Sequence, residues 1–218
     1  MITIYGVYRS RALRNIWLCE EIGLPFRHVP VIQTYRLPDP VPADAPLHTR
    51  SAEFLATNPN GHVPTMEDDG LVLHESLAIN LYLARKYGGV LGPQGLAEEG
   101  QFAMWTLWAA TECEPRAIEI LFNRPQLPAA DRNEAVFKAA IDALRRPFAV
   151  LDAALADAGF LVGGRFTAAD INVAEVARYA LPAPELFDAA PHVKAWLATC
   201  HARPAWKKIS ARREQEPA

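Results

Sequence analysis

Three arginines surround a serine at the point where the first predicted helix begins. Arg9, Arg11 and Arg14 flank Ser10, shortly after a predicted strand at 2–5. The start of a helix already carries partial positive charge, so cations are unfavourable there. Backbone N–H groups at a strand-to-helix turn also bind anions. The pattern indicates either that Ser10 is a simple N-cap of a helix beginning at Arg11, or that this turn receives an anionic ligand.

A proline opens another predicted strand, in the segment Val63-Pro64-Thr65. Proline has no N–H to donate to a sheet, so it is tolerated there only where that donor is not needed. A cis bond between Val63 and Pro64 would turn Val63 outward, where its N–H and C=O would pair with an extended peptide. An ordinary edge-strand proline remains the alternative.

A carboxylate and a hydroxyl stand at the start of a further predicted helix, in His74-Glu75-Ser76. Ser76 as an N-cap, with Glu75 beside the positive helix end, is a sufficient structural explanation. The same groups would also bind an amino acid, with Glu75 holding its ammonium group and Ser76 its carboxylate. Two helix starts and an exposed peptide edge together suit a short acidic peptide.

The elements that carry these residues lie in the first 88 residues. Hydrophobic patterning predicts strands at 2–5, 27–32, 63–66 and 71–73, and helices after the first and last of them. The turn Asp69-Gly70 joins the last two strands into a hairpin. A strand–helix–strand start gives a parallel pair, so we expect an α/β domain with a mixed sheet.

The remainder of the chain predicts helices alone. Runs without internal glycine, or nearly so, cover 98–122, 131–158 and 168–181, and a last helix around 192–201 precedes a charged tail at 211–214 that we expect to fray. Pro115 and Pro147 predict kinks in the first two helices.

The predicted elements divide the chain into two domains. We expect residues 1–88 to form the α/β domain, 89–96 a linker and 97–218 the all-helical domain. Residues 30–50 hold five of the 18 prolines and predict an irregular surface segment.

The composition is that of a soluble globular protein. Of the 218 residues 50% are hydrophobic, and the net charge is −3, which gives no overall basic surface for nucleic acid. Apolar stretches fall short of the roughly 20 residues of a membrane helix, and no signal-peptide core is present. We expect a cytoplasmic protein without nucleic-acid or membrane partners.

The three cysteines are odd in number and far apart, at Cys19, Cys113 and Cys200. This spacing favours neither a disulfide scaffold nor a zinc site, and we expect no metal. Each cysteine lies in a helical apolar pattern, where a free thiol packs as a small hydrophobic group.

Five motifs occur in the order and spacing of one protein family. They are Ile4-Tyr5-Gly6 with Arg9-Ser10-Arg11, Asn58 to Pro64, Asp69-Gly70, Leu73 to Ile79, and Phe166 to Ile171. Over its whole length the sequence resembles the cytosolic glutathione transferases, of the bacterial, serine-type zeta/phi/theta-like kind. The resemblance implies a thioredoxin-like N-terminal domain with a cis-proline at Pro64, an all-helical C-terminal domain and a homodimer.

The resemblance also implies roles in binding the co-substrate glutathione. Ser10 matches the catalytic serine of zeta- and phi-like classes, and the backbone of Val63 would pair with the glutathione cysteine. Glu75 and Ser76 match the residues that hold the γ-glutamyl end, and His62 stands where a Gln or Lys often contacts the glycine carboxylate.

Departures from the family pattern leave a rival for the catalytic group. Tyr5 lies in register with the tyrosine that the alpha, mu and pi classes use. Val7 stands where theta-like members have their serine, and Ser10 stands where beta-like members carry a cysteine.

The second substrate is expected between the two domains. Tyr8 would form one wall, and Trp105, Trp108 and Glu112 share a helix face at i, i+3 and i+7. Core or interface packing is an equally good explanation of these three. In the motif of the helical half, Thr167 and Asp170 form a structural capping box.

The activity implied is conjugation of the glutathione thiolate to small hydrophobic electrophiles. A non-catalytic glutathione-binding or apolar-ligand-binding protein remains an alternative, as does a glutathione-dependent isomerase or lyase on the same fold. A disulfide reductase would need a reactive cysteine at the first helix start, and Cys19 lies some two turns into that helix.

Overall fold

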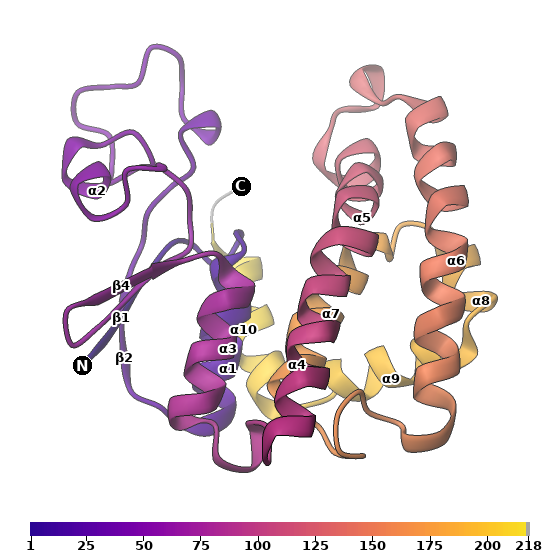
Figure 1. Cartoon of the computed structure of the whole chain (residues 1–218). Helices are drawn as coiled ribbons and strands as arrows, with labels where there is room; N and C mark the ends of the chain where they lie inside the picture. Colours follow the sequence, from indigo (N-terminus) through magenta and orange to yellow (C-terminus); the bar gives the residue numbers. More distant parts are fainter. Residues whose placement is uncertain (217–218) are drawn as a thin grey trace. The chain divides into compact units, whose positions relative to one another are not determined.

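The computed structural model describes residues 1–216, which fall into two compact units. Unit 1 comprises Met1–Gly89 and the segment that begins at Pro204, and unit 2 comprises Val90–Arg203. Figure 1 shows the elements of each unit, coloured along the chain. Residues 217–218, which end the expected helical domain, lie outside the described residues.

Unit 1 contains a mixed sheet of four strands, as the alternation of strands and helices predicts. The strands are β1 (Ile2–Tyr5), β2 (Phe26–Val29), β3 (Thr65–Asp68) and β4 (Leu71–His74). Their order is β2-β1-β3-β4, with β2 parallel to β1 and with β3 antiparallel to both β1 and β4. The hairpin at Asp69-Gly70 is therefore confirmed.

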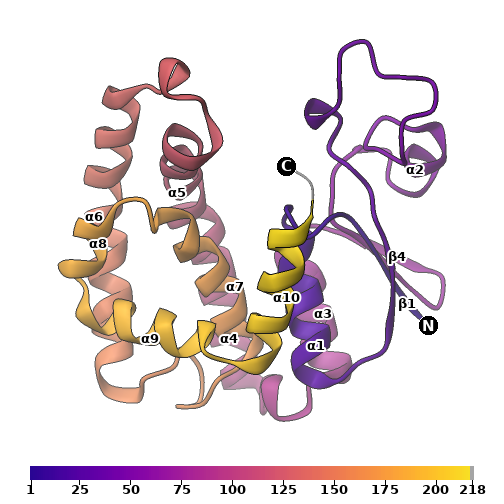
Figure 2. The same cartoon turned by 180° about the vertical axis from the view of Figure 1, so that it is seen from behind.

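Two helices, α1 (Ala12–Ile22) and α3 (Ser76–Tyr87), lie side by side against the sheet (Figures 1 and 2). The core between them consists of fully buried apolar side chains, among them Ile4, Leu13, Ile16, Met66, Ile79 and Leu83. Burial of such side chains contributes about 1.5–3 kcal/mol each.

The proline-rich segment 30–50 is irregular, as expected, except for the short 3-10 turn η1 (Thr34–Arg36). A six-residue helix that the sequence patterning did not predict, α2 (Ala52–Thr57), follows it. Its one fully buried side chain, Phe54, lies 6.2 Å from the ring of Tyr5 in β1.

The expected frayed tail at 211–214 is instead part of a helix, α10 (Pro204–Gln215). Trp206 and Ile209 are its buried residues, and the ring of Trp206 lies 4.7 Å from that of Trp17 in α1. These contacts place α10 in unit 1, beside α1 (Figure 2), and not in the expected helical domain. A charged segment with apolar residues at i and i+3 is typical of a helix that docks by one face.

The regular elements of unit 2 are helical, and its one isolated β-bridge among the described residues joins Val162 and Arg165. Its helices are α4 (Leu96–Trp108), α5 (Glu114–Leu121), α6 (Glu134–Ala158), α7 (Ala168–Ala177), α8 (Pro184–Asp188) and α9 (Pro191–His201). Short turns join them: η2 (Gly89–Leu91), η3 (Ala109–Cys113), η4 (Phe122–Gln126), η5 (Ala129–Asp131) and η6 (Arg178–Ala180). Within residues 1–216, no helix has the length and apolar character needed to cross a bilayer.

The two internal prolines of unit 2 have different outcomes. The expected single helix 98–122 is divided, because α4 ends at Trp108 and the π-helical turn η3 precedes α5. Pro115 lies in the first turn of α5, where a missing N–H costs little. Helix α6 passes through Pro147 as one helix of 25 residues.

The capping box predicted for Thr167 and Asp170 is present at the start of α7. Thr167 Oγ1 accepts from Ala169 N at 3.3 Å, and Asp170 Oδ2 accepts from Thr167 N at 2.8 Å. Asp170 is fully buried, and its Oδ1 accepts from Trp196 Nε1 at 2.9 Å and from Leu161 N at 3.1 Å. The carboxylate thus joins three segments of unit 2.

Candidate active site

Ser10 lies in a tight turn between β1 and α1. Its N–H and its hydroxyl both donate to Val7 O, at 3.1 Å and 2.6 Å, and its Oγ accepts from Ala12 N at 3.1 Å. The helix begins at Ala12 and its N-cap residue is Arg11, so the expectation that Ser10 is the N-cap of a helix beginning at Arg11 is wrong by one residue. The Ser10 hydroxyl nevertheless accepts from the N–H of the first helical residue. The hydroxyl therefore stands at the positive end of α1, with a proton that it can redirect to a ligand.

Ser10 and Val63 both lie close to Gly6. Its φ is 140°, and a Cβ at this position would lie 2.7 Å from Ala12 Cβ and 3.3 Å from both Ser10 Oγ and Val63 Cβ. Only glycine satisfies this combination of positive φ and close approach. Two features separated by more than fifty residues in the sequence therefore face one point in space.

The loop before β3 leaves the backbone of Val63 available. The Val63-Pro64 bond is cis. The buried Asn58 holds the loop, since its Nδ2 donates to His62 O and to Thr65 Oγ1, both at 2.9 Å. With the rest of residues 1–216, the N–H and C=O of Val63 make no hydrogen bond.

The start of α3 differs in detail from the expected cap. Glu75 is the N-cap residue, and Ser76 is already the first residue of the helix. Glu75 has φ 74°, a conformation that costs a non-glycine residue about 1–3 kcal/mol and clusters at functional sites. Its side chain is exposed, whereas Ser76 is buried.

A buried polar network connects the two helix starts. Arg14 Nη1 donates to Ser76 Oγ at 3.0 Å, and Asn15 Nδ2 donates to Ser76 O at 2.8 Å and to Asn80 Oδ1 at 2.7 Å. Asn80 Nδ2 returns a bond to Arg14 O at 3.2 Å. The sequence patterning treated Arg14 only as one of three crowded cations and overlooked both asparagines. Both asparagines lie on apolar helix faces, and a polar residue in such a position indicates a buried hydrogen bond.

The rival hydroxyl of Tyr5 is directed elsewhere. Tyr5 OH donates to Glu67 Oε2 at 3.4 Å, and burial together with the charge of Glu67 raises the pKa of the phenol. Because successive strand side chains point to opposite faces, Tyr5 points away from the face on which Ile4 is buried. This geometry favours Ser10.

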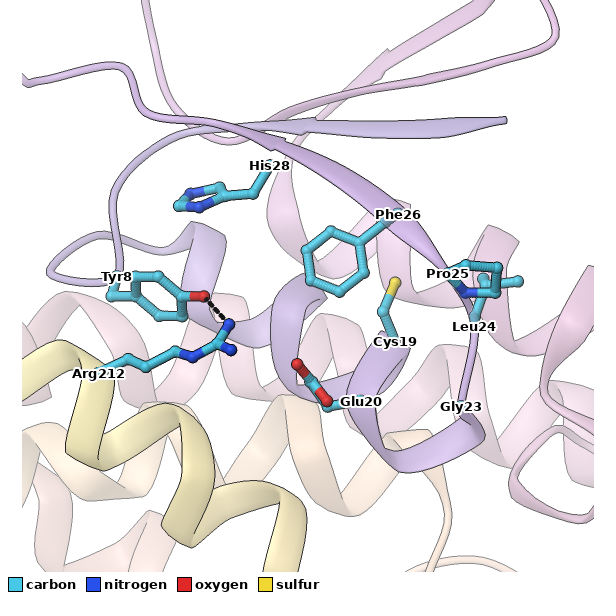
Figure 3. Close-up of a pocket in the computed structure, with 9 residues that line it drawn as sticks. All are labelled: Tyr8, Cys19, Glu20, Gly23, Leu24, Pro25, Phe26, His28 and Arg212. Atoms are coloured by element: carbon cyan, nitrogen blue, oxygen red, sulfur yellow. Dashed lines mark hydrogen bonds between the residues drawn. The ribbon is translucent and has the colours of Figure 1, made fainter.

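Tyr8 is held inside unit 1. Its ring lies edge-on to His28 at 5.0 Å, and its hydroxyl accepts from Arg212 Nη1 at 2.9 Å, in a pocket lined also by Cys19 and Phe26 (Figure 3). Only 8% of Tyr8 is exposed. A role as a wall for the second substrate stays a prediction, and it would require Tyr8 to leave this position.

The other expected ligand contacts also stay predictions. Trp105 is buried in unit 2 and packs edge-to-face on Trp108, at 5.2 Å between ring centroids. Glu112 is exposed in the π-helical turn η3, which breaks the α-helical spacing from Trp108. His62 is exposed beside Val63.

The cysteines behave as packing residues. All three are buried, and burial raises the pKa of both Cys19 and Cys113 to about 12. Neither thiol forms a thiolate near neutral pH, so neither is suited to nucleophilic chemistry.

The site therefore combines a hydroxyl donor at a helix start, a free peptide edge and a second helix start with an exposed carboxylate. A hydroxyl at the positive end of a helix stabilises an anion, and a free edge pairs with extended backbone. This arrangement suits a short peptide that carries a reactive anion beside Ser10.

Comparison with known proteins matches two parts of the chain to one protein family. Residues 9–86 match the model of the glutathione S-transferase N-terminal domain, and residues 114–204 match that of the C-terminal domain. Glutathione S-transferase 3 of Zea mays is 34% identical over 96% of this chain and 93% of its own length. GstB of Escherichia coli strain K12 is 29% identical over 96% and 97%.

Solved structures agree with these matches. A theta class glutathione S-transferase from Xanthomonas axonopodis pv. citri, with glutathione bound, is 32% identical with a TM-score of 0.81, over 95% of each chain. Glutathione transferase F7 from Populus trichocarpa is 26% identical with a TM-score of 0.82, over 98% of this chain and 99% of its own.

Proposed function

This chain belongs to the glutathione S-transferase family, and on that premise we propose that it conjugates glutathione to small hydrophobic electrophiles through Ser10. The observation that supports this most is the convergence of Ser10 Oγ and Val63 on Gly6. The Xanthomonas relative holds glutathione. The shared fold supports glutathione as the co-substrate here.

Glutathione would be held mainly by its backbone and its two ends. The free N–H and C=O of Val63 would pair with the cysteinyl residue as an added strand does. Glu75 would bind the γ-glutamyl ammonium group, while Ser76 and the start of α3 would bind the carboxylate. His62 would contact the glycine carboxylate from the same loop.

Ser10 would act as a hydrogen-bond donor and not as a base. In this structure the Ser10 hydroxyl donates to Val7 O. Rotation of the hydroxyl group would direct the same proton to the glutathione sulfur, while Ala12 N still donates to Oγ. A free thiol titrates near pH 8.5, and lowering this by about two units requires about 3 kcal/mol. One charge-assisted bond contributes about 1.5–3 kcal/mol and a helix start about 0.3–1. Together they are sufficient.

The reaction is then a nucleophilic attack. The thiol proton passes to water, and the thiolate forms a sulfur–carbon bond to the electrophile, whose leaving group departs with the electron pair of the broken bond. Reductase chemistry is disfavoured, because Cys19 is fully buried and burial raises its pKa to about 12.

Binding of glutathione is the first test of this proposal. Glu75→Ala and Ser76→Ala should each weaken glutathione binding by about 1–3 kcal/mol, because each leaves one charged end of the peptide unpaired. Isothermal titration calorimetry measures this, with Glu185→Ala, an exposed glutamate of unit 2, as the control. Absence of both binding heat and thermal shift at millimolar glutathione would contradict the proposal.

We further propose a homodimer. Exposed apolar side chains on α4 support it, with Met104 51% and Leu107 64% exposed. Light scattering should give about twice 24.1 kDa, and Leu107→Asp should lower that mass, because burying an unpaired charge is costly. A mass of 24.1 kDa throughout the micromolar range would refute the dimer.

A further inference from the structure

The segment after α10 brings a carboxylate to the Ser10 turn. Glu216 Oε1 accepts from Tyr8 N at 2.9 Å, and Glu216 Oε2 accepts from Arg9 N at 2.7 Å. Two successive backbone N–H groups therefore share one carboxylate, a geometry typical of anion-binding turns. Hydrogen bonds to a charged acceptor are about twice as strong as neutral ones.

The turn is held from both sides. Ser10 N and Ser10 Oγ bind Val7 O on one side, while Glu216 binds the N–H groups of the two residues between them. The orientation of the Tyr8 and Arg9 peptide groups sets the direction in which the Ser10 side chain projects. The contacts of Glu216 and those of Ser10 Oγ are on different atoms, so Glu216 leaves the hydroxyl available to a ligand.

Two of the arginines near this turn donate to backbone carbonyl groups. Arg36 Nη2 donates to Arg9 O at 2.8 Å, and Arg9 Nε donates to Arg213 O at 3.1 Å. Glu216 itself binds two backbone N–H groups at the same turn. The negative partner expected at this turn is in this case supplied by the chain itself.

Contacts of helix α10 with α1 and Tyr8 hold the segment that carries Glu216. Trp206 packs on Trp17, and Lys208 Nζ donates to Glu20 Oε2 at 2.5 Å. Arg212 reaches Tyr8 OH one turn further along (Figure 3). The first two contacts lie on α1 and the third lies before it, so that the segment after α10 meets the turn that precedes α1.

We propose that Glu216 is a positioning residue for Ser10, which fixes the turn so that the Ser10 hydroxyl meets the glutathione sulfur. This rests on the proposed role of Ser10. The alternative is that Glu216 occupies the place of an anionic ligand, and this alternative predicts the opposite change in the pKa of bound glutathione. Removal of a positioning residue raises the pKa of bound glutathione, whereas removal of a competing charge lowers it.

The test follows the absorbance of the glutathione thiolate against pH in the full chain. Glu216→Ala should raise the pKa of bound glutathione by about half a unit to one unit, which lowers the thiolate fraction about three- to tenfold below that pKa. Glu216→Gln keeps one acceptor oxygen, so the pKa of bound glutathione should fall between the values of the wild type and of Glu216→Ala. The control, Glu214→Ala, removes an exposed carboxylate of the same helix end and should leave the pKa unchanged. Affinity for glutathione should change less than about twofold, because neither peptide end is touched.

Two further measurements separate this proposal from the role of Ser10. Amide hydrogen exchange at Tyr8 and Arg9 should be faster in Glu216→Ala, and Glu216→Ala should add no pKa shift in a Ser10→Ala background. If Ser10→Ala shifts the pKa but Glu216→Ala leaves it unchanged or lowers it, the positioning role is wrong. If Ser10→Ala itself has no effect, the proposed role of Ser10 fails and the positioning role fails with it.

Discussion

Replacing Ser10 with alanine should raise the pKa of bound glutathione by about one to two units. The change removes a charge-assisted hydrogen bond of about 1.5–3 kcal/mol, and one pKa unit corresponds to about 1.4 kcal/mol. Conjugation of a model electrophile near neutral pH should fall about ten- to hundredfold, since the thiolate is the nucleophile. Affinity for glutathione should change little, because in the proposed site Val63, Glu75 and Ser76 would hold the rest of the peptide.

The Ser10→Ala variant also loses its bond from Ala12 N. Loss of a side-chain acceptor at a helix start costs about 1 kcal/mol of folding stability, so activity must be compared well below the melting temperature of the variant. Stability and thiolate pKa are measured separately, by thermal unfolding and by absorbance titration. An inactive variant that retains the wild-type thiolate pKa would show that only folding had been damaged.

Tyr5→Phe is the matched control, because it removes a hydroxyl and leaves the ring in place. Tyr5 OH is engaged by Glu67, so we expect the thiolate titration to be unchanged. If Tyr5→Phe shifts the titration and Ser10→Ala does not, the tyrosine is the catalytic group. If neither variant shifts it, backbone N–H groups and the nearby arginines stabilise the thiolate, and no side-chain hydroxyl is catalytic.

The parts of the site that sequence reasoning finds are those with local physical causes. A turn residue such as Gly70 and alternating apolar residues define the hairpin, and the motif at Glu75-Ser76 marks a helix start. Once the order of the strands is known, the starts of α1 and α3 are expected to lie near each other. The cis bond at Pro64 is expected only from the family resemblance, since proline alone leaves both alternatives open.

The parts that sequence reasoning does not find depend on contacts between distant residues. Glu216 and Tyr8 are 208 residues apart, and no local pattern predicts that they meet. The pairing of Arg14 with Ser76 spans 62 residues. The sequence of α10 alone predicts a frayed tail, because an isolated helix of its length is only marginally stable. In the structure α10 packs against Trp17, and no local pattern predicts this contact.

Asp170 is the position whose loss should destabilise the fold most. It is fully buried, and both of its oxygens accept two hydrogen bonds: Oδ1 from Leu161 N and Trp196 Nε1, and Oδ2 from Thr167 N and Oγ1. Asp170→Ala leaves these donors buried without acceptors and should cost about 1–3 kcal/mol of unfolding free energy for each donor that stays unpaired. Asp170→Asn keeps the shape but replaces one oxygen by a donor, and should cost about 1–3 kcal/mol. Urea unfolding of unit 2 measures both, with the exposed Asp157→Asn as control.

The pH dependence of stability distinguishes the charge of Asp170 from its shape. Burial raises the pKa of Asp170 from 3.8 to about 6, although the four hydrogen bonds act to lower it. The native state therefore holds this proton more tightly than the unfolded state does. Its contribution to stability is complete below about pH 4 and is lost as the pH rises through about 6. The unfolding free energy of the wild type, relative to that of Asp170→Asn, should fall over this window by up to about 3 kcal/mol. Parallel pH profiles for the two proteins would show that Asp170 does not titrate in this range in the folded state.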